Sequence, residues 1–189
     1  MKMAHHDSFS KKNRRLQGYD YRAEGLYFIT ICTKDRLPYF GEVRNGLMEL
    51  SDEGIIARDY WLEISDHNPQ VLLGEFVVMP NHVHGIIGLE RASLPVTMAL
   101  QCKAATVETA SDMKHISGLA PKAGSISRII GAYKAACTRM IRSVSTNPFA
   151  WQNHFHDRII CNGQELQRME AYIISNPEKW AEDKFCINY

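Results

Sequence analysis

The chain has 189 residues, enough for one domain with a sizeable core. Hydrophobic residues make up 45% and charged residues 23%, the balance of a globular protein in water. The formal net charge of +1 excludes a protein that binds nucleic acid through bulk charge alone, but a local basic surface is compatible with it.

The cysteines and the absence of long apolar segments indicate the compartment. The five cysteines are scattered, and no two of them have Cys-x-x-Cys spacing, so we expect reduced thiols. No apolar stretch approaches membrane-spanning length, and the polar, basic N-terminus has no signal-peptide core. The sequence therefore predicts a cytoplasmic protein without a membrane partner.

Residues 1–21 form a polar stretch in which basic and aromatic side chains alternate, among them Arg14, Arg15, Tyr19 and Tyr21. A solvated tail explains this composition. A basic arm that contacts phosphates and stacks on bases explains it equally well. The composition alone leaves both interpretations open.

The first regular element is predicted over residues 26–33, which are rich in β-branched and aromatic residues and favour a strand. A loop follows, with a short hairpin expected at Asn45 and Gly46. Ser51 is placed to cap a helix that ends before Pro69, and two acidic residues stand in its first turn.

Two further strands are predicted over 71–79 and 82–89, joined by a tight Pro-Asn turn. Side chains alternate along a strand, so His82 and His84 project from one face and Val83 from the other. Two imidazoles at this spacing on a rigid strand are well placed to share a divalent metal ion. Two structural histidines that form hydrogen bonds with neighbouring residues explain the pair equally well. Only further ligands elsewhere in the sequence can distinguish a metal site from this alternative.

Residues 90–124 have no sustained periodicity and predict a long excursion from the domain. An amphipathic helix follows over 125–145. Its apolar side chains fall within one broad arc: Ile129, Ile130, Tyr133, Cys137, Met140, Ile141 and Val144. Three arginines fall on the opposite side, where a solvated face is favoured over a phosphate-contacting ridge: Arg128, Arg139 and Arg142.

The last elements are a strand over 155–161 and a helix over 164–175, which stops because the residue before Pro177 resists the helical conformation. The order β-α-β-β-α-β is that of a ferredoxin-like antiparallel sheet with two helices on one face. We therefore expect an α+β fold with an additional C-terminal helix. We expect a single domain over 1–189 that includes the arm and the excursion.

The C-terminal helix carries Tyr172 and Asn176 four residues apart, and hence on one face. The amide oxygen of Asn176 is a hard ligand that suits Mg²⁺ or Mn²⁺. A phenol has a reference pKa of about 10 and attacks phosphorus only when a cation or a base assists its ionisation. Helix packing explains most tyrosines, and a helix stop before proline by itself explains Asn176.

Together these stretches resemble the single-tyrosine HUH transposases, the IS200-like branch that includes the REP-associated tyrosine transposases. The matching residues span nearly the whole chain: 14–21, 25–30, 79–87, 151–152 and 172–177. The most specific combination is the run Met-Pro-Asn-His-Val-His-Gly followed by a late Tyr-x-x-x-Asn-Pro.

The resemblance implies an HUH endonuclease fold with a divalent metal ion, Mg²⁺ or Mn²⁺, bound by His82, His84 and Asn176. It implies that Tyr172 attacks single-stranded DNA, which leaves a 5′-phosphotyrosine link and a free 3′ hydroxyl. Members of the family commonly recognise hairpin DNA ends. A homodimer is compatible with the resemblance, and whether Tyr172 serves its own metal site or that of a partner stays open.

The resemblance also covers the expected DNA contacts: Arg14, Arg15, Tyr19, Tyr21, Trp151 and Gln152. The strand that follows departs from the family, which usually has a pair of tyrosines and an arginine there. This chain has His154 or Phe155 at the tyrosine positions and Cys161 at the arginine position. The departure affects DNA contacts from that strand and leaves the nucleophile unaffected.

Three alternatives compete with a transposase. A non-catalytic nucleic-acid-binding module could use the same sheet by stacking bases on it, as RNA-recognition folds do. Relaxases and replication initiators share the HUH chemistry but are usually larger. A histidine-triad hydrolase requires a third alternating histidine two residues after His84. This chain has Ile86 there, which argues against such a hydrolase.

Overall fold

The computed structural model describes residues 24–90 and 124–186. The whole predicted arm and most of the predicted excursion lie outside the described residues, and so do four of the expected DNA contacts: Arg14, Arg15, Tyr19 and Tyr21. In the described part of the chain, no helix combines the length and apolar composition needed to cross a membrane.

The described elements follow the predicted order closely. They are β1 (Gly25–Cys32), the 3-10 helix η1 (Lys34–Arg36), β2 (Gly41–Arg44), β3 (Leu47–Leu50), α1 (Asp52–Leu62), α2 (Ile64–His67), β4 (Val71–Met79), β5 (His82–Leu89), α3 (Ile126–Val144), β6 (His156–Ile160), α4 (Gly163–Ser175) and the 3-10 helix η2 (Trp180–Glu182). The helix predicted to end before Pro69 is divided into α1 and α2.

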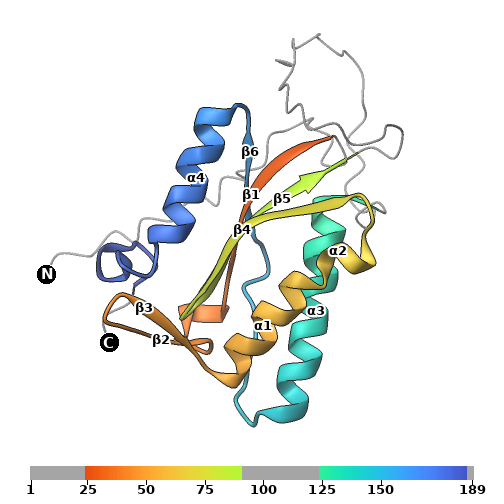
Figure 1. Ribbon diagram of the computed structural model, residues 1–189. Coiled ribbons are helices and arrows are strands. Elements are labelled where there is room, and N and C mark those ends of the chain that lie inside the picture. The colour runs from red at the N-terminus through yellow and green to blue at the C-terminus, as the bar shows by residue number, and fades with distance from the viewer. Residues whose placement is uncertain (1–23, 91–123, 187–189) are drawn as a thin grey trace, which may run out of the picture.

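The main sheet has the strand order β4-β5-β1-β6, and all neighbouring strands are antiparallel. Helices α1, α2 and α3 lie on one side of this sheet and α4 lies on the other (Figure 1). This is the predicted ferredoxin-like arrangement, and the α+β fold class is confirmed. The short hairpin β2-β3 turns at Asn45 and Gly46, which have φ angles of 51° and 75°.

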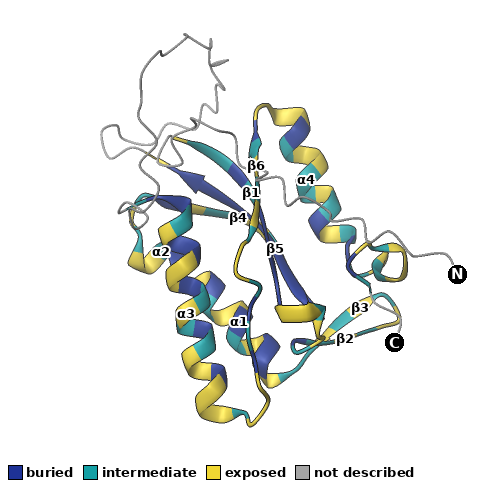
Figure 2. Ribbon diagram, turned by 180° about the vertical axis from the view of Figure 1, so that it is seen from behind, coloured by how far each residue is buried: buried dark blue, intermediate teal, exposed yellow. Residues whose placement is uncertain are grey.

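The larger core lies between the sheet and the helices α1 and α3. Tyr27 and Ile29 of β1 pack there with Trp61 of α1 and Tyr133 of α3, and all four side chains are buried (Figure 2). The indole ring of Trp61 packs directly against Gly85. A Cβ atom at this glycine would come within 2.2 Å of the ring. Any side chain at this position of β5 would therefore displace α1.

A smaller core on the opposite face joins the sheet to α4. It is formed by Ile86 of β5, Ile160 of β6 and Ile173 of α4, with Phe28 and Met169 packed around them. Helix α4 thus covers the sheet face opposite to α1, α2 and α3 (Figure 1).

The apolar arc predicted for α3 packs against the core along most of the helix but not at its C-terminal end. Ile129, Tyr133 and Ile141 are buried, whereas Met140 and Val144 are 40% and 58% exposed. Helical spacing places both in the arc, so their exposure means that the packing surface does not extend over the last turn of α3.

Candidate active site

The two histidines of β5 point away from the main core. Val83 and Ile87 pack into the core with α1 and α3. His82 and His84 face the α4 side, where their ring centroids lie 4.4 Å apart and both side chains are almost completely buried. The prediction that the two imidazoles share one face is confirmed.

The proton of His82 is placed by its neighbour Asn81. The amide nitrogen of Asn81 donates to the carbonyl oxygens of Arg36, at 3.0 Å, and of Phe185, at 2.8 Å. Its amide oxygen must therefore face the ring, 2.9 Å from Nδ1 of His82, which acts as the donor. The proton then resides on Nδ1, so Nε2 carries a free lone pair. Nε2 is buried and has no hydrogen-bond partner among the described residues.

His84 is oriented in a similar way from β1. Its Nδ1 lies 2.8 Å from the hydroxyl oxygen of Thr30, which is paired with it across the two strands. Its ring stacks on that of Phe28, with centroids 5.2 Å apart. Nε2 of His84 is thereby directed toward α4, where it lies 3.4 Å from the hydroxyl oxygen of Tyr172. Partners of this kind at Nδ1 hold a histidine ready to bind a metal ion through Nε2.

Tyr172 meets an aspartate that follows α4. Its hydroxyl group donates to Oδ2 of Asp183 at 3.1 Å, and the same oxygen accepts from Nδ2 of Asn176 at 3.0 Å. Oδ1 of Asp183 accepts from the backbone N–H of Phe185 at 2.8 Å. The predicted pair on α4 therefore converges on one carboxylate beside the histidines.

Burial controls the protonation of these groups. Loss of solvent lowers the pKa of His84 from its usual 6.5 to about 4, and the negative charge of Asp183 opposes this shift. Burial also lowers the pKa of His82 well below its usual value. Burial, and then the charge of Asp183, raises the pKa of Tyr172 to about 12. At neutral pH both imidazoles are neutral and the phenol keeps its proton.

The donor atoms fit a divalent metal ion. His82, His84 and Asp183 each offer a ligand atom, and these atoms all lie within 4.8 Å of one another. Two buried polar atoms of the region lack any hydrogen bond among the described residues, namely Nε2 of His82 and Oδ1 of Asn176. A buried polar atom without a partner is costly, and a cation held by His82, His84 and Asp183 would satisfy Nε2 of His82. This group could therefore hold a metal ion with mixed nitrogen and oxygen ligands.

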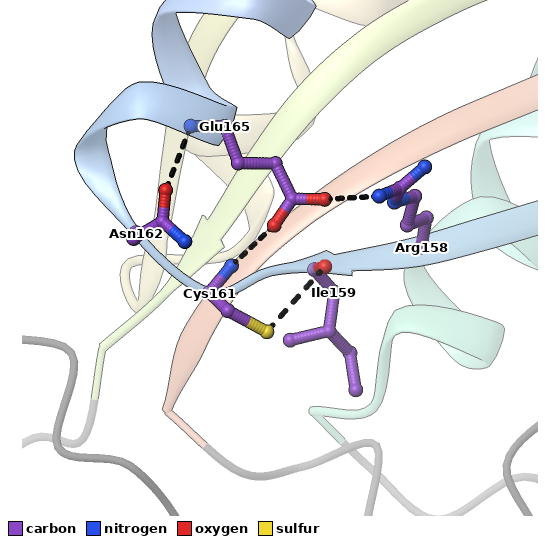
Figure 3. Close-up of polar contacts among 5 residues, drawn as sticks. All are labelled: Arg158, Ile159, Cys161, Asn162 and Glu165. Carbon is purple, nitrogen blue, oxygen red and sulfur yellow. Dashed lines mark hydrogen bonds and ion pairs between the residues drawn. The ribbon is translucent and has the colours of Figure 1, made fainter.

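The start of α4, the helix that carries Tyr172, is anchored to β6 (Figure 3). The side chain of Asn162 caps the helix by accepting from the backbone N–H of Glu165 at 2.9 Å. The carboxylate of Glu165 accepts from the backbone N–H of Cys161 at 3.0 Å and pairs with Arg158 at 2.6 Å. These contacts, the backbone N–H of Cys161 first, lower the pKa of Glu165. The departure at Cys161 therefore lies in the anchor of the helix.

Trp151 and Gln152 are not brought to the histidine pair. Trp151 belongs to the larger core, and its indole N–H donates to the carbonyl oxygen of Lys134 at 3.2 Å. The backbone of Gln152 donates to the carbonyl oxygen of Cys32 at 2.9 Å and accepts from Lys134. The packing of Trp151 explains its presence without DNA, and the contact expected from Gln152 stays a prediction.

Comparison with known proteins places the chain in a family. No protein-family model matches the sequence. A Haemophilus influenzae protein described as uncharacterized is 34% identical over 179 residues, which cover 94% of this chain and 94% of that protein. The chain belongs to the family of this H. influenzae protein.

Solved structures identify the fold of this family member. The structure of a REP-associated tyrosine transposase bound to a REP hairpin aligns with a TM-score of 0.57 at 17% identity, over 90% of this chain and 77% of that chain. A second solved structure, from Deinococcus radiodurans, aligns with a TM-score of 0.46 at 15% identity, over 85% of this chain and 95% of that chain. The first alignment confirms the HUH transposase resemblance at the level of the fold.

Two features of the site in this family member were not predicted from its sequence, namely Asp183 and the hydrogen-bonding role of Asn81. Asn81 stands inside the quoted motif, and its position directly before His82 is the signal that could have revealed its contact with the ring. Asp183 lies seven residues beyond Asn176 in a polar stretch with no periodicity, and we find no sequence signal that marks it.

Acid should destabilise this family member through His84. A histidine whose pKa is about 4 when folded and 6.5 when unfolded contributes stability that is fully present above pH 6.5 and is lost as the pH falls toward 4. The difference corresponds to about 3 kcal/mol. Urea unfolding with EDTA at pH 7 and pH 4.5 should show a smaller loss for His84→Gln than for the wild type. The exposed His67→Gln should behave as the wild type, and an equal loss in all three proteins would contradict the prediction.

Proposed function

We propose that the chain is a metal-dependent transposase that cleaves and rejoins single-stranded DNA through a covalent link to Tyr172. The observation that carries the proposal is the position of the phenol. Its oxygen lies 3.4 Å from Nε2 of His84 and donates to Asp183, within the group that could hold a metal ion. A nucleophile beside both a base and a cation site is the arrangement that covalent phosphoryl transfer requires.

We assign separate roles to the two oxygen donors of the site. Both oxygens of Asp183 already accept hydrogen bonds, whereas Oδ1 of Asn176 accepts none from the described residues. Asn176 would therefore join His82 and His84 in holding Mg²⁺ or Mn²⁺, and Asp183 would take the proton of the phenol. The bound ion supplies Lewis-acid polarisation of the phosphodiester and favours ionisation of the phenol.

The reaction balances with the groups present. The proton of Tyr172 passes to Asp183, and the bond between the phenolic oxygen and phosphorus forms. The bond from phosphorus to the 3′ oxygen breaks, and that oxygen leaves with the electron pair and takes the proton that Asp183 accepted. A second 3′ hydroxyl reverses the same steps and rejoins the strand. Since Tyr172 meets the histidines of its own chain, we propose that it acts in cis.

The DNA substrate is proposed from the resemblance and the shared fold. The solved transposase of the same fold is bound to a REP hairpin, and we propose single-stranded or hairpin DNA for this chain. Arg14, Arg15, Tyr19 and Tyr21 stay candidate contacts on the arm. A non-catalytic module that stacks bases on an open sheet is disfavoured, because α4 covers the sheet face that carries the histidines.

The experiment is a search for the covalent adduct. The protein is incubated in Mn²⁺ with labelled single-stranded DNA that contains the hairpins flanking its own gene. We expect a protein–DNA adduct that survives denaturing electrophoresis and maps by mass spectrometry to the peptide containing Tyr172. The same DNA annealed to its full complement serves as the control. An adduct on Tyr133, a core residue whose hydroxyl donates to the carbonyl oxygen of Ala57, would contradict the mechanism.

A further inference from the structure

A cationic groove of about 540 Å³ lies on the other side of the sheet from α4. One wall is α3, which contributes Lys134, Arg139 and Arg142, and the opposite wall is the segment 150–153. Thr138 of α3 also lines the groove. Helix α3 packs on the sheet face opposite to α4, so the groove is separate from the histidine pair (Figure 2).

The charged side chains that line the groove are all positive. Three of the side chains that line it are cationic and none is acidic, although the whole chain has nearly equal numbers of basic and acidic residues. Among residues 24–90 and 124–186, neither Arg139 nor Arg142 forms an ion pair, whereas the exposed Arg44 and Arg58 do. Unpaired arginines that flank a groove are typical of a surface that binds phosphate groups.

The groove is built on fixed elements. The ammonium group of Lys134 donates to the carbonyl oxygen of Gln152 at 2.6 Å and to that of Asn153 at 3.3 Å. The guanidinium of Arg142 donates to the carbonyl oxygen of Phe149 at 3.3 Å. These bonds tie α3 to the opposite wall, so the groove keeps its width before a ligand arrives. Arg139 and Arg142 are three residues apart, and so they are neighbours on the helix surface.

The wall of the groove continues to the strand ends that carry the proposed active site. The backbone N–H of Gln152 donates to the carbonyl oxygen of Cys32, and Cys32 is the partner of His82 in the pairing of β1 with β5. Thr33 forms a bridge with Trp151, and its backbone N–H donates to the carbonyl oxygen of Asn81. This end of the sheet therefore joins the histidine pair on one face to the wall of the groove on the other.

We propose that this groove binds the phosphate backbone of the same DNA molecule that Tyr172 cleaves, at a position beyond the cleaved phosphodiester. The proposal rests on the proposed function. Arg139 and Arg142 contact adjacent phosphates, while Lys134 contributes its charge and holds the wall. Contacts of this kind position the DNA without reading its sequence.

The test measures binding without chemistry. In a Tyr172→Phe background with EDTA, fluorescence anisotropy follows binding of the hairpin DNA across a range of salt concentrations. The double variant Arg139→Ala/Arg142→Ala should bind more weakly at low salt. The magnitude of its slope of log K against log salt should fall by about two, since each phosphate contact contributes about one.

The matched control is Arg44→Ala/Arg58→Ala, which removes the same charge from exposed arginines outside the groove. It should keep the slope of the parent protein. An unchanged slope in the groove variant, or an equal fall in both double variants, overturns the proposal. A groove variant that loses binding of a hairpin RNA and keeps binding of the DNA overturns it as well. Adduct formation by the wild type is scored separately, so a groove that fails is distinguished from an enzyme that fails.

Discussion

Replacement of Tyr172 by phenylalanine is expected to abolish the covalent adduct and to reduce single-turnover cleavage by at least about 10⁴-fold, the scale on which loss of a covalent nucleophile acts in other enzymes. Phenylalanine has no oxygen to attack phosphorus and lacks the donor that meets Asp183 at 3.1 Å. The ring keeps its edge contact with Phe28, so folding should survive with a loss of about 1 kcal/mol for the missing hydrogen bond.

The measurement combines a cleavage time course with electrophoresis of the adduct. Tyr60→Phe is the matched control, because it removes a hydroxyl group from α1 on the other side of the sheet. The control should cleave at the wild-type rate. Binding of hairpin DNA by Tyr172→Phe should match that of the wild type, which separates the loss of chemistry from the loss of substrate. Persistence of the adduct in Tyr172→Phe would refute the assignment of the nucleophile.

Replacement of His82 by alanine should remove metal binding and, with it, DNA cleavage. The wild type should be stabilised by Mn²⁺ by about 2.7 kcal/mol when the free ion is present at a hundred times its Kd. His82→Ala removes Nε2, a neutral nitrogen atom that has no hydrogen-bond partner in the described part of the chain and is free to bind a metal ion. The thermal midpoint of this variant should therefore not respond to Mn²⁺. Calorimetric titration with Mn²⁺ provides a second readout that does not depend on cleavage.

Two further variants decide which oxygen completes the metal site. If Asn176 is the ligand, Asn176→Ala should lose most of the Mn²⁺ response and Asp183→Asn should keep it in part. The reverse order would assign the ligand to Asp183. His154→Ala, an exposed histidine beyond Trp151, is the control and should respond as the wild type does. A normal Mn²⁺ response in His82→Ala would remove the metal role from this histidine.

The sequence predicts the sheet well because its elements are bounded by strong local signals. The strands on either side of the Pro-Asn turn have the predicted limits, since two apolar runs and the turn between them define these limits. Ser51 caps α1 as predicted, and Ser125 caps α3 in the same way. Such signals depend only on neighbouring residues, so they can be read without the fold.

The site could be predicted only in part, because its contacts join distant residues. Alternation along a strand and one helical turn are enough to pair His82 with His84 and Tyr172 with Asn176. The position of Asp183 depends on how the chain turns back after α4, and the burial of Trp151 depends on how segment 150–153 packs between the end of β1 and α3. Neither packing event leaves a periodic pattern in the sequence.

The side chain of Asn81 has consequences for which residues can precede the first histidine. Its site offers two carbonyl oxygens and one ring N–H, so it requires two donors and one acceptor on one short side chain. A carboxylate would set like partial charges against both carbonyls, and an alanine would leave the ring free to turn. Of the short side chains, only the carboxamide of asparagine offers two hydrogen-bond donors and one acceptor. The Asn-His pair thus behaves as one chemical unit, in which the first residue determines the tautomer of the second.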